Sequence, residues 1–170
     1  MSLDKADKAI LRTLQKDARI SNVSLADQIG LSEAACLRRV RSLEKSGYID
    51  AYVGLLNPAM VGLPGTVFVE ITLYQEQQKD LEAFERAARG VPEVMECYLM
   101  TGEYDYLLRV SIKDLEDFER VHRQALTRLP GVSRVQSSIA LRVVKKNTAL
   151  PISEAESQHS SAGGTNRSVR

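Results

Sequence analysis

The feature that most restricts the fold of this chain is a segment in its first third, where one amphipathic stretch turns sharply into another. The segment reads SLADQIGLSEAACLRRVRSLEKS and runs from Ser24 to Ser46. Gly30 ends the first stretch, because a residue in the left-handed conformation at a helix end is usually glycine. Ser32 caps the second stretch. We therefore predict two helices joined by a three-residue turn, residues 30–32, which is typical of a helix-turn-helix.

A further helix precedes this pair. Asp4 is its expected N-cap, and apolar residues recur on one face as far as about Asp17. Ser24 is the expected cap of the second helix, and Ala26 is small enough for two helices to cross closely. Cys36 and other apolar residues of the third helix face inward in this pattern. The sequence thus predicts an N-terminal three-helix domain with a small shared core.

The periodicity changes after the Ser-Gly pair at residues 46–47. Residues 48–56 are rich in Ile, Val, Tyr and Leu and are predicted to form a strand. Asn-Pro and a Gly-Leu-Pro-Gly run then interrupt the pattern within residues 57–65. We place a hinge there, between a first domain over residues 1–56 and a second over residues 66–152.

The second domain alternates strand and helix patterns in a defined order. The predicted elements are a strand at 66–74, a helix at 77–89, strands at 94–100 and 106–112, a helix at 115–129 and a strand at 132–144. The order βαββαβ is that of a ferredoxin-like domain, so the fold class is α+β. An antiparallel sheet with helices on one face leaves its other face open. The simplest cover is the same sheet of a second chain, so we expect a homodimer.

Composition narrows the class of protein. Hydrophobic residues make up 44% of the chain, which is typical of a globular protein. No apolar run approaches the roughly 20 residues that span a bilayer, and the charged start does not resemble a signal peptide, so we expect no membrane partner and a cytoplasmic location. Residues 153–170 are polar, rich in Ser and Gly, and are expected to form a disordered tail.

The residues that commonly bind metals are few and scattered. Cys36 and Cys97 lie in apolar segments without a CxxC or CxxH spacing, so we expect buried free thiols and not a zinc site. The two histidines have no cluster of ligands near them. We therefore assign no metal, no catalytic residue and no cofactor.

The charge distribution favours nucleic acid as a partner of the first domain. Residues 1–50 carry nine Lys and Arg against seven Asp and Glu, whereas residues 66–150 carry twelve against thirteen. Within residues 32–46 there are four basic residues and two acidic ones. A weakly basic helical domain beside a neutral one is what a small reader of double-stranded DNA fused to another module looks like.

In a helix-turn-helix, the second helix of the pair lies in the major groove with its first residues at base edges. An Arg there pairs with guanine or holds a phosphate, a Glu accepts from cytosine, and residues starting the preceding helix meet phosphates. The alternative is an ordinary three-helix bundle with a solvated charged face. The predicted DNA-binding residues are Asn22, Ser24, Ser32, Glu33, Ala34, Ala35, Leu37, Arg38, Arg39 and Arg41.

Four segments together resemble the leucine-responsive/asparagine-synthesis regulator family, Lrp/AsnC. They are residues 3–49, the GLLNPAMVGLP run, the MTGEYDYLLRV run and the VQSSIALRVVKKNTALPI run, and the likeness covers residues 3–152. The resemblance implies a transcription regulator of amino-acid metabolism. It also implies dimers formed through the αβ domain, often octamers of four dimers, and an amino-acid effector bound between dimers beside the turn after the second strand.

The resemblance carries the effector site to a turn and to the last strand. The residues implied are Met100, Thr101, Gly102, Glu103, Tyr104, Asp105, Tyr106, Gln136, Ser137 and Ser138. Gly102 allows a ligand close to the backbone, whose N–H groups could hold an α-carboxylate, and Asp105 could receive an α-ammonium. The alternative is a plain hairpin turn with packing tyrosines. Glu103 and Ala35 depart from the family pattern, in which Asp and Pro are frequent.

Two other functions are weighed against this one. Dimeric ferredoxin-like proteins also include small oxygenases and isomerases, but no segment offers a nucleophile with a base or a convergent pair of acids. An architectural protein that compacts DNA with weak specificity is the other alternative, and a high preference for one sequence over random DNA would discriminate against it. The identity of the effector, and the choice between dimer and octamer, stay open.

Overall fold

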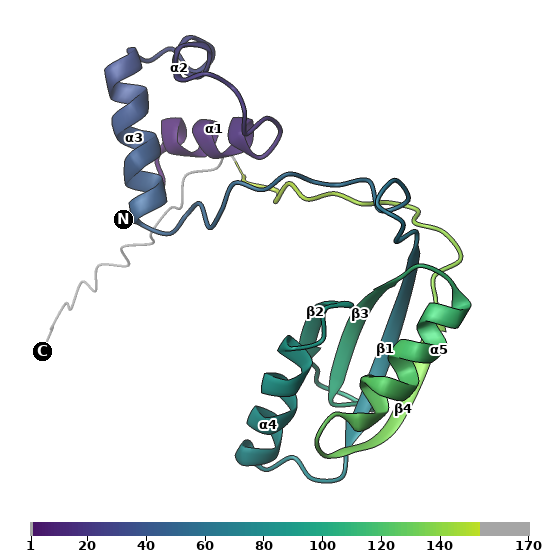
Figure 1. Ribbon diagram of the computed structural model, residues 1–170. Coiled ribbons are helices and arrows are strands. Elements are labelled where there is room, and N and C mark those ends of the chain that lie inside the picture. The colour runs from purple at the N-terminus through teal and green to yellow at the C-terminus, as the bar shows by residue number, and fades with distance from the viewer. Residues whose placement is uncertain (1, 154–170) are drawn as a thin grey trace, which may run out of the picture. The chain divides into compact units, whose positions relative to one another are not determined.

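The computed structural model describes residues 2–153, which form two compact units (Figure 1). Among the described residues, the first unit holds residues 2–53 together with residues 145–153, and the second holds Gly54–Val144. The chain therefore crosses between the units twice. Residues 145–152, expected in the second domain, pack with the first unit instead, because their backbone and one apolar side chain find partners there. Except for Ser153, the predicted tail lies outside the described residues.

The first unit contains three helices, α1 (Lys5–Leu14), α2 (Asn22–Ile29) and α3 (Glu33–Lys45). Asp4 caps α1 as expected, because its carboxylate accepts the Asp7 N–H at 2.8 Å while the Asp7 carboxylate accepts the Asp4 N–H at 3.2 Å. The helix ends three residues before Asp17. The buried apolar core of the unit consists of Ile10, Leu11, Leu25, Ala26, Cys36 and Leu43.

Two sequence-based predictions in this region are wrong. Ser21, not Ser24, is the N-cap of α2, and its hydroxyl accepts the Ser24 N–H at 3.1 Å. Residues 48–56 form no strand, although they are as apolar as predicted. A strand needs a second backbone to pair with, and the described chain offers none there. Val53, Leu55 and their neighbours are left exposed.

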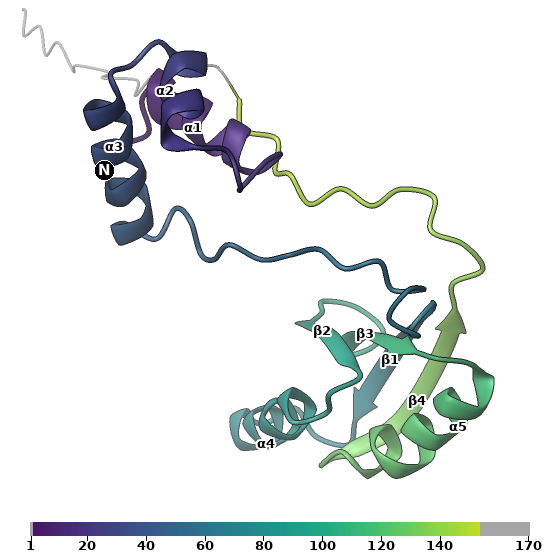
Figure 2. The same cartoon turned by 45° about the horizontal axis from the view of Figure 1, so that its top comes forward.

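The second unit is a four-stranded antiparallel sheet with the strand order β2-β3-β1-β4. Both helices lie on the same face of the sheet (Figure 2). The order of the elements along the chain confirms the predicted βαββαβ pattern. The elements are β1 (Gly65–Leu73), α4 (Gln78–Arg89), β2 (Val94–Leu99), β3 (Tyr106–Ile112), α5 (Leu115–Gln124), the 3₁₀ turn η1 (Leu126–Arg128) and β4 (Val132–Ile139).

The last two elements are shorter than predicted. The helix of 115–129 stops at Gln124 and tightens into η1, with Ala125 at φ −117° outside the α-helical range. Strand β4 ends at Ile139, and the apolar residues that follow it, such as Leu141, are exposed. The run of apolar residues continues past the end of β4. It therefore does not mark the end of the strand, because the pairing with β1 stops at Ile139.

The sheet has two unlike faces. On β1 the side chains of Val67, Val69 and Ile71 are fully buried beneath the helices, whereas Phe68, between them, is 40% exposed. β3 shows the same alternation. Alternate strand residues point to opposite faces, so one face forms the core of the unit and the other faces outward in the single chain.

None of the helices in residues 2–153 is long and apolar enough to span a membrane. In the same residues, no group of three or more His, Cys, Asp or Glu is placed to hold a metal ion. The two thiols differ, because Cys36 is buried as predicted while Cys97, on the edge strand β2, is exposed. The prediction that both are buried is therefore wrong for Cys97, which has no neighbouring strand beyond it.

Candidate functional site

The turn between α2 and α3 has the geometry that the sequence predicts. Gly30 adopts φ 76°, where a side chain would be strained, and the N–H of Leu31 returns to the carbonyl of Ala26 at 2.9 Å. The Ser32 hydroxyl then accepts the N–H of Ala35 at 3.3 Å and caps α3. These contacts close α2, reverse the chain over three residues and start α3 in a defined direction.

One face of α3 is exposed, and it holds most of the predicted DNA-binding side chains. Cys36 and Leu43 are buried on the opposite face. Leu37 is 39% exposed although it is apolar, and neither Arg38 nor Arg41 has a hydrogen bond or ion pair within residues 2–153. The predicted DNA-binding residues that are exposed on α3 and its cap are Ser32, Glu33, Ala34, Leu37, Arg38 and Arg41, with Ala35 half-buried.

Arg39, also predicted to bind DNA, is engaged in an ion-pair network within the first unit. Its Nη1 lies 2.8 Å from Asp4 Oδ2 and 2.8 Å from Asp7 Oδ1, so it connects α3 to the start of α1. The Asp7 carboxylate is 2% exposed and needs this partner. The hydrogen bonds that Arg39 donates to Asp7 and then to Asp4 raise the pKa of its guanidinium, which stays charged. The structure makes Arg39 a packing residue of the first unit.

The two residues of α2 that were predicted to bind DNA are likewise engaged in local contacts. The Asn22 Nδ2 donates to the Glu33 carbonyl at 3.0 Å, which holds the start of α2 against the start of α3. The Ser24 hydroxyl accepts a hydrogen bond from the Ser21 hydroxyl at 2.9 Å. Both side chains lie at the start of α2, so a phosphate at this point would meet groups that already have a protein partner.

A shallow polar cleft lies beside the turn after β2, on the outward face of the sheet. Its volume is about 80 Å³. Cross-strand pairs of β1 and β4 form one side of the cleft, since Glu70 lies opposite Gln136 and Thr72 lies opposite Arg134 in the ladder. The Arg134 Nη2 donates to Gln136 Oε1 at 2.7 Å. The residues lining the cleft are Glu70, Thr72, Glu103, Tyr104, Arg134 and Gln136.

The cleft contains only part of the predicted effector set. Glu103, Tyr104 and Gln136 line it, whereas Met100, Thr101, Gly102, Ser137 and Ser138 do not. Ser137 pairs with Val69, whose side chain belongs to the helix-covered face, so its own side chain points away from the cleft. Sequence reasoning missed Glu70, Thr72 and Arg134. The two-residue alternation of β1 and β4 places them on that face, but only the register brings them together.

Two residues of the predicted effector turn serve the fold. The Asp105 Oδ2 accepts the Leu73 N–H at 2.6 Å and its own N–H donates to the Ile71 carbonyl at 2.9 Å, so the carboxylate holds the turn against β1. Tyr106 is buried under α4 and stacks on Phe84 with ring centroids 4.3 Å apart. Burial, then its hydrogen bond to Glu85, raises the pKa of Tyr106, which stays a neutral donor.

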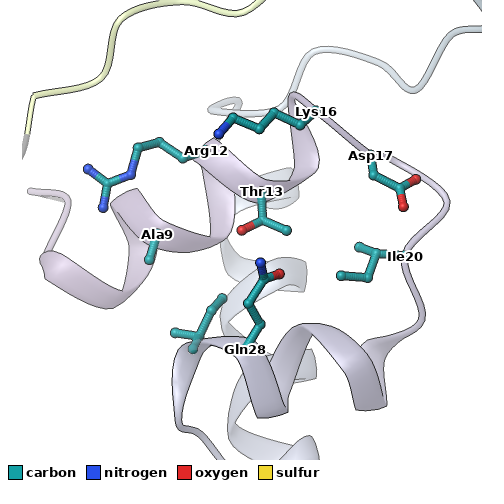
Figure 3. A pocket seen from close by; sticks show the side chains of 8 residues that line it. Ala9, Arg12, Thr13, Lys16, Asp17, Ile20 and Gln28 are labelled. Atoms are coloured by element: carbon teal, nitrogen blue, oxygen red, sulfur yellow. The ribbon is translucent and has the colours of Figure 1, made fainter.

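A larger cleft of about 420 Å³ lies between α1 and α2 in the first unit (Figure 3). Thr13 and Gln28 point toward each other across it, and Arg12 and Lys16 extend from α1 at its rim. Ala9, Asp17, Ile20 and Ile29 complete its lining. The sequence indicated no site here. The cleft lies on α1, away from the exposed face of α3, and its open shape suits a gap between two crossing helices.

Family models match both parts of the chain. Residues 3–50 match the model described as winged helix-turn-helix DNA-binding, and residues 66–150 match the Lrp/AsnC ligand binding domain. The chain is 41% identical over 150 residues to the leucine-responsive regulatory proteins of Escherichia coli K12 and Salmonella typhimurium, which covers 88% of this chain and 92% of each relative.

Solved structures show the same similarity. A transcriptional regulator of Neisseria meningitidis in complex with L-methionine matches with a TM-score of 0.84 and 37% identity, over 88% of this chain and 97% of that one. The feast or famine regulatory protein of M. tuberculosis, also complexed with L-methionine, matches with a TM-score of 0.81 and 31% identity, over 89% and 100%. The chain belongs to the Lrp/AsnC family, whose members are transcriptional regulators and not enzymes, and it combines a DNA-binding helix-turn-helix with a ligand-binding αβ domain.

Proposed function

We propose that this regulator binds a specific DNA sequence through the exposed face of α3 and changes that binding when an amino acid occupies the polar cleft beside the turn after β2. The observation that carries the proposal is the cleft itself. It places the guanidinium of Arg134 within one small site with the carboxylates of Glu70 and Glu103. A cation and an anion side by side are what an amino acid requires, since its α-carboxylate and α-ammonium carry opposite charges.

The related proteins support an amino acid of the methionine or leucine type. Two relatives are solved with L-methionine, and curated relatives are named leucine-responsive. The cleft of one chain is only about 80 Å³ and is almost entirely polar, so it offers no room for an apolar side chain. We infer that the effector is bound between dimers, so that a chain of a neighbouring dimer completes the site and contributes the apolar part.

A second chain also suits the outward face of the sheet. Phe68 and Tyr98 are 40% and 52% exposed there, next to the ion pair of Arg109 Nη2 with Glu96 Oε1 at 2.6 Å. An apolar and partly charged sheet face that repeats in a second copy forms a two-fold interface. The proposed assembly is a homodimer on this face, with octamers built from such dimers. Its two α3 helices would meet half-sites one helical turn apart.

The proposed DNA contacts are the exposed ones. Arg38 and Arg41 reach bases or phosphates, Leu37 contacts an apolar base edge, and Ser32, Glu33, Ala34 and Ala35 enter the groove first. Asn22 and Ser24 lie beside the phosphate backbone. A regulator that binds DNA acts where the DNA is, so we place it in the cytoplasm. Ser138, which lies opposite Phe68 on the outward face, remains a proposed contact of an effector shared between chains, whereas Ser137 would contribute only its backbone.

The test is a titration of DNA at fixed salt against the full chain, with random DNA as a competitor. We expect tight binding to one promoter sequence that changes by fivefold or more when L-methionine or L-leucine is added. Arg134→Ala should leave DNA binding intact and remove the response to the amino acid. Arg128→Ala, an exposed arginine of η1 outside the cleft, is the matched control. An amino-acid response that survives Arg134→Ala would contradict the proposed site.

DNA contacts are tested in the same titration. Arg38→Ala and Arg41→Ala should each weaken specific binding by about 1–3 kcal/mol if the guanidinium pairs with a base. A contact to a phosphate would instead weaken all sequences alike and reduce the dependence on salt. Unchanged binding in both variants would show that α3 does not enter the groove. Light scattering of Phe68→Asp, compared with the parent chain, tests the dimer face.

A further inference from the structure

The chain that leaves the sheet after β4 ends on the DNA-binding unit. The side-chain amide of Gln15, at the C-terminal end of α1, makes two hydrogen bonds with the backbone of Leu150. Its Nε2 donates to the Leu150 carbonyl at 3.2 Å, and its Oε1 accepts the Leu150 N–H at 2.6 Å. A primary amide that donates and accepts at the same residue imitates a neighbouring strand and satisfies both backbone groups at once.

The residues on either side of Leu150 support the same attachment. The Asn147 Oδ1 accepts the Ala149 N–H at 3.1 Å and turns the chain, while the Ile152 N–H returns to the Leu150 carbonyl at 3.0 Å. The half-buried Ile152 then packs against the small core of the helix-turn-helix. We call residues 145–152 the C-terminal arm. Backbone hydrogen bonds and an apolar anchor hold it on the first unit.

The arm is continuous with the strand that lines the proposed effector cleft. β4 carries Arg134 and Gln136 in the cleft and ends at Ile139, and the same chain reaches Gln15 on α1 at Leu150. The two units are thus joined by two chain segments, one at Val53–Gly54 and one at Val144–Lys145. A single flexible connection transmits little between domains, whereas a second attachment limits the orientations that the first leaves open.

We propose that the C-terminal arm, seated on α1 of its own chain, is the element through which occupancy of the effector cleft changes DNA binding. This inference rests on the proposed function. An effector that holds β4 in one position changes how easily the arm reaches its seat, and it acts only to the extent that it binds one of the two states better. With the arm seated, the helix-turn-helix is restrained. With the arm released, it is connected to the sheet by one segment only.

The first experiment asks whether the arm is seated, by amide hydrogen exchange of the full chain. We expect the Leu150 and Ile152 amides to exchange slowly in the parent protein and at least fivefold faster in Gln15→Ala, because two hydrogen bonds are lost. Gln28→Ala is the matched control, since it removes a side-chain amide on the same unit that, within residues 2–153, makes no hydrogen bond to the arm. Exchange of Leu150 in the parent chain as fast as in an unstructured peptide would overturn the proposal.

The second experiment distinguishes a seat on the same chain from a seat on a second copy. Gln15→Cys with Leu150→Cys is oxidised in a Cys97→Ser background, because Cys97 is exposed and Cys36 is buried. Cross-linked monomers on a denaturing gel support the arm as proposed. Cross-linked dimers would overturn it and assign the seat to the partner's arm.

The third experiment measures coupling, using DNA affinity with and without L-methionine or L-leucine. Gln15→Ala and Ile152→Ala should bind DNA within about twofold of the parent without effector, yet lose at least four-fifths of its effector-dependent change, while Gln28→Ala keeps it. Full coupling in both arm variants would overturn the inference and leave the proposed function standing. A parent protein that binds DNA but ignores every amino acid would remove the effector half of the proposed function, and the arm would then be no coupling element even if it is seated.

Discussion

The two units of this chain are stabilised in different ways. Among residues 2–153, the sheet unit buries a core of thirteen apolar residues, whereas the helix-turn-helix buries six. The smaller unit adds polar and peripheral contacts, namely the Asp4–Arg39–Asp7 network, the helix caps and the C-terminal arm. A small core stabilises weakly for its size, so polar contacts carry a larger share. The comparison indicates that the sheet unit has the higher free energy of unfolding and that the DNA-binding unit is more sensitive to changes in its polar contacts.

The largest effect is expected in the sheet unit. Phe84→Ala removes a fully buried ring that stacks on Tyr106, and it should lower the free energy of unfolding of that unit by about 3–5 kcal/mol. Hydrogen exchange measured segment by segment reports each unit separately. We expect α1, α2 and α3 to keep their protection. Equal loss of protection in both units would show that they unfold together and would break the comparison.

The next effect concerns the polar network of the first unit. Arg39→Ala leaves the buried carboxylate of Asp7 without its cation and should cost about 2–3 kcal/mol, less than for a fully buried pair because the guanidinium is 34% exposed. Arg38→Ala, one residue away on the exposed face, should change stability by about 0.5 kcal/mol at most and is the matched control. Urea unfolding followed by helix content measures both. Similar losses in the two variants would contradict the separate roles of these arginines.

A smaller effect tests the cap of α2. Ser21→Ala removes the hydroxyl that accepts the Ser24 N–H and should cost about 1 kcal/mol of stability of the first unit. Ser24→Ala removes only a hydroxyl that accepts a bond from Ser21, so it should cost less. The melting temperatures of the two variants, measured under the same conditions, show which substitution costs more stability. A larger loss of stability in Ser24→Ala than in Ser21→Ala would identify Ser24 as the N-cap of α2.

The smallest effect is a dependence on pH. The backbone N–H of Asp7, and then Arg39, lower the pKa of Asp4 in the folded chain. A lowered pKa means that the contribution of Asp4 to stability is fully present above the unfolded value of roughly 4 and is lost as the pH falls through the folded value. The melting temperatures of the parent and Asp4→Asn should therefore differ at pH 7 and converge as the pH falls below the folded pKa of Asp4. Because the Asp4 side chain is half exposed, the difference at pH 7 is small. A difference in melting temperature that grows toward low pH would contradict a lowered pKa of Asp4 in the folded chain.

Local patterns predicted much of the fold because they depend on neighbours in the sequence. The turn at Gly30 and Ser32 and the alternation of β3 require only residues a few positions apart. The same reasoning went wrong where a distant partner decides. Arg39 belongs to the basic run by sequence but lies against Asp7, and residues 48–56 have the composition of a strand but no second backbone to pair with.

The candidate sites show the same division. The exposed face of α3 follows from helical periodicity, so Leu37, Arg38 and Arg41 could be named from the sequence. The polar cleft depends on the register between β1 and β4, which sets Glu70 opposite Gln136 and Thr72 opposite Arg134. Two further contacts could not be predicted from the neighbouring sequence. They are the hydrogen bond of Asp105 with Leu73 on β1 and the hydrogen bonds of Gln15 with Leu150 of the C-terminal arm. The sequence by itself determined the family, the three helices of the first unit and the βαββαβ order of the second. Only the tertiary structure decided which polar groups meet, because hydrogen bonds and ion pairs between distant residues form only after the chain has folded.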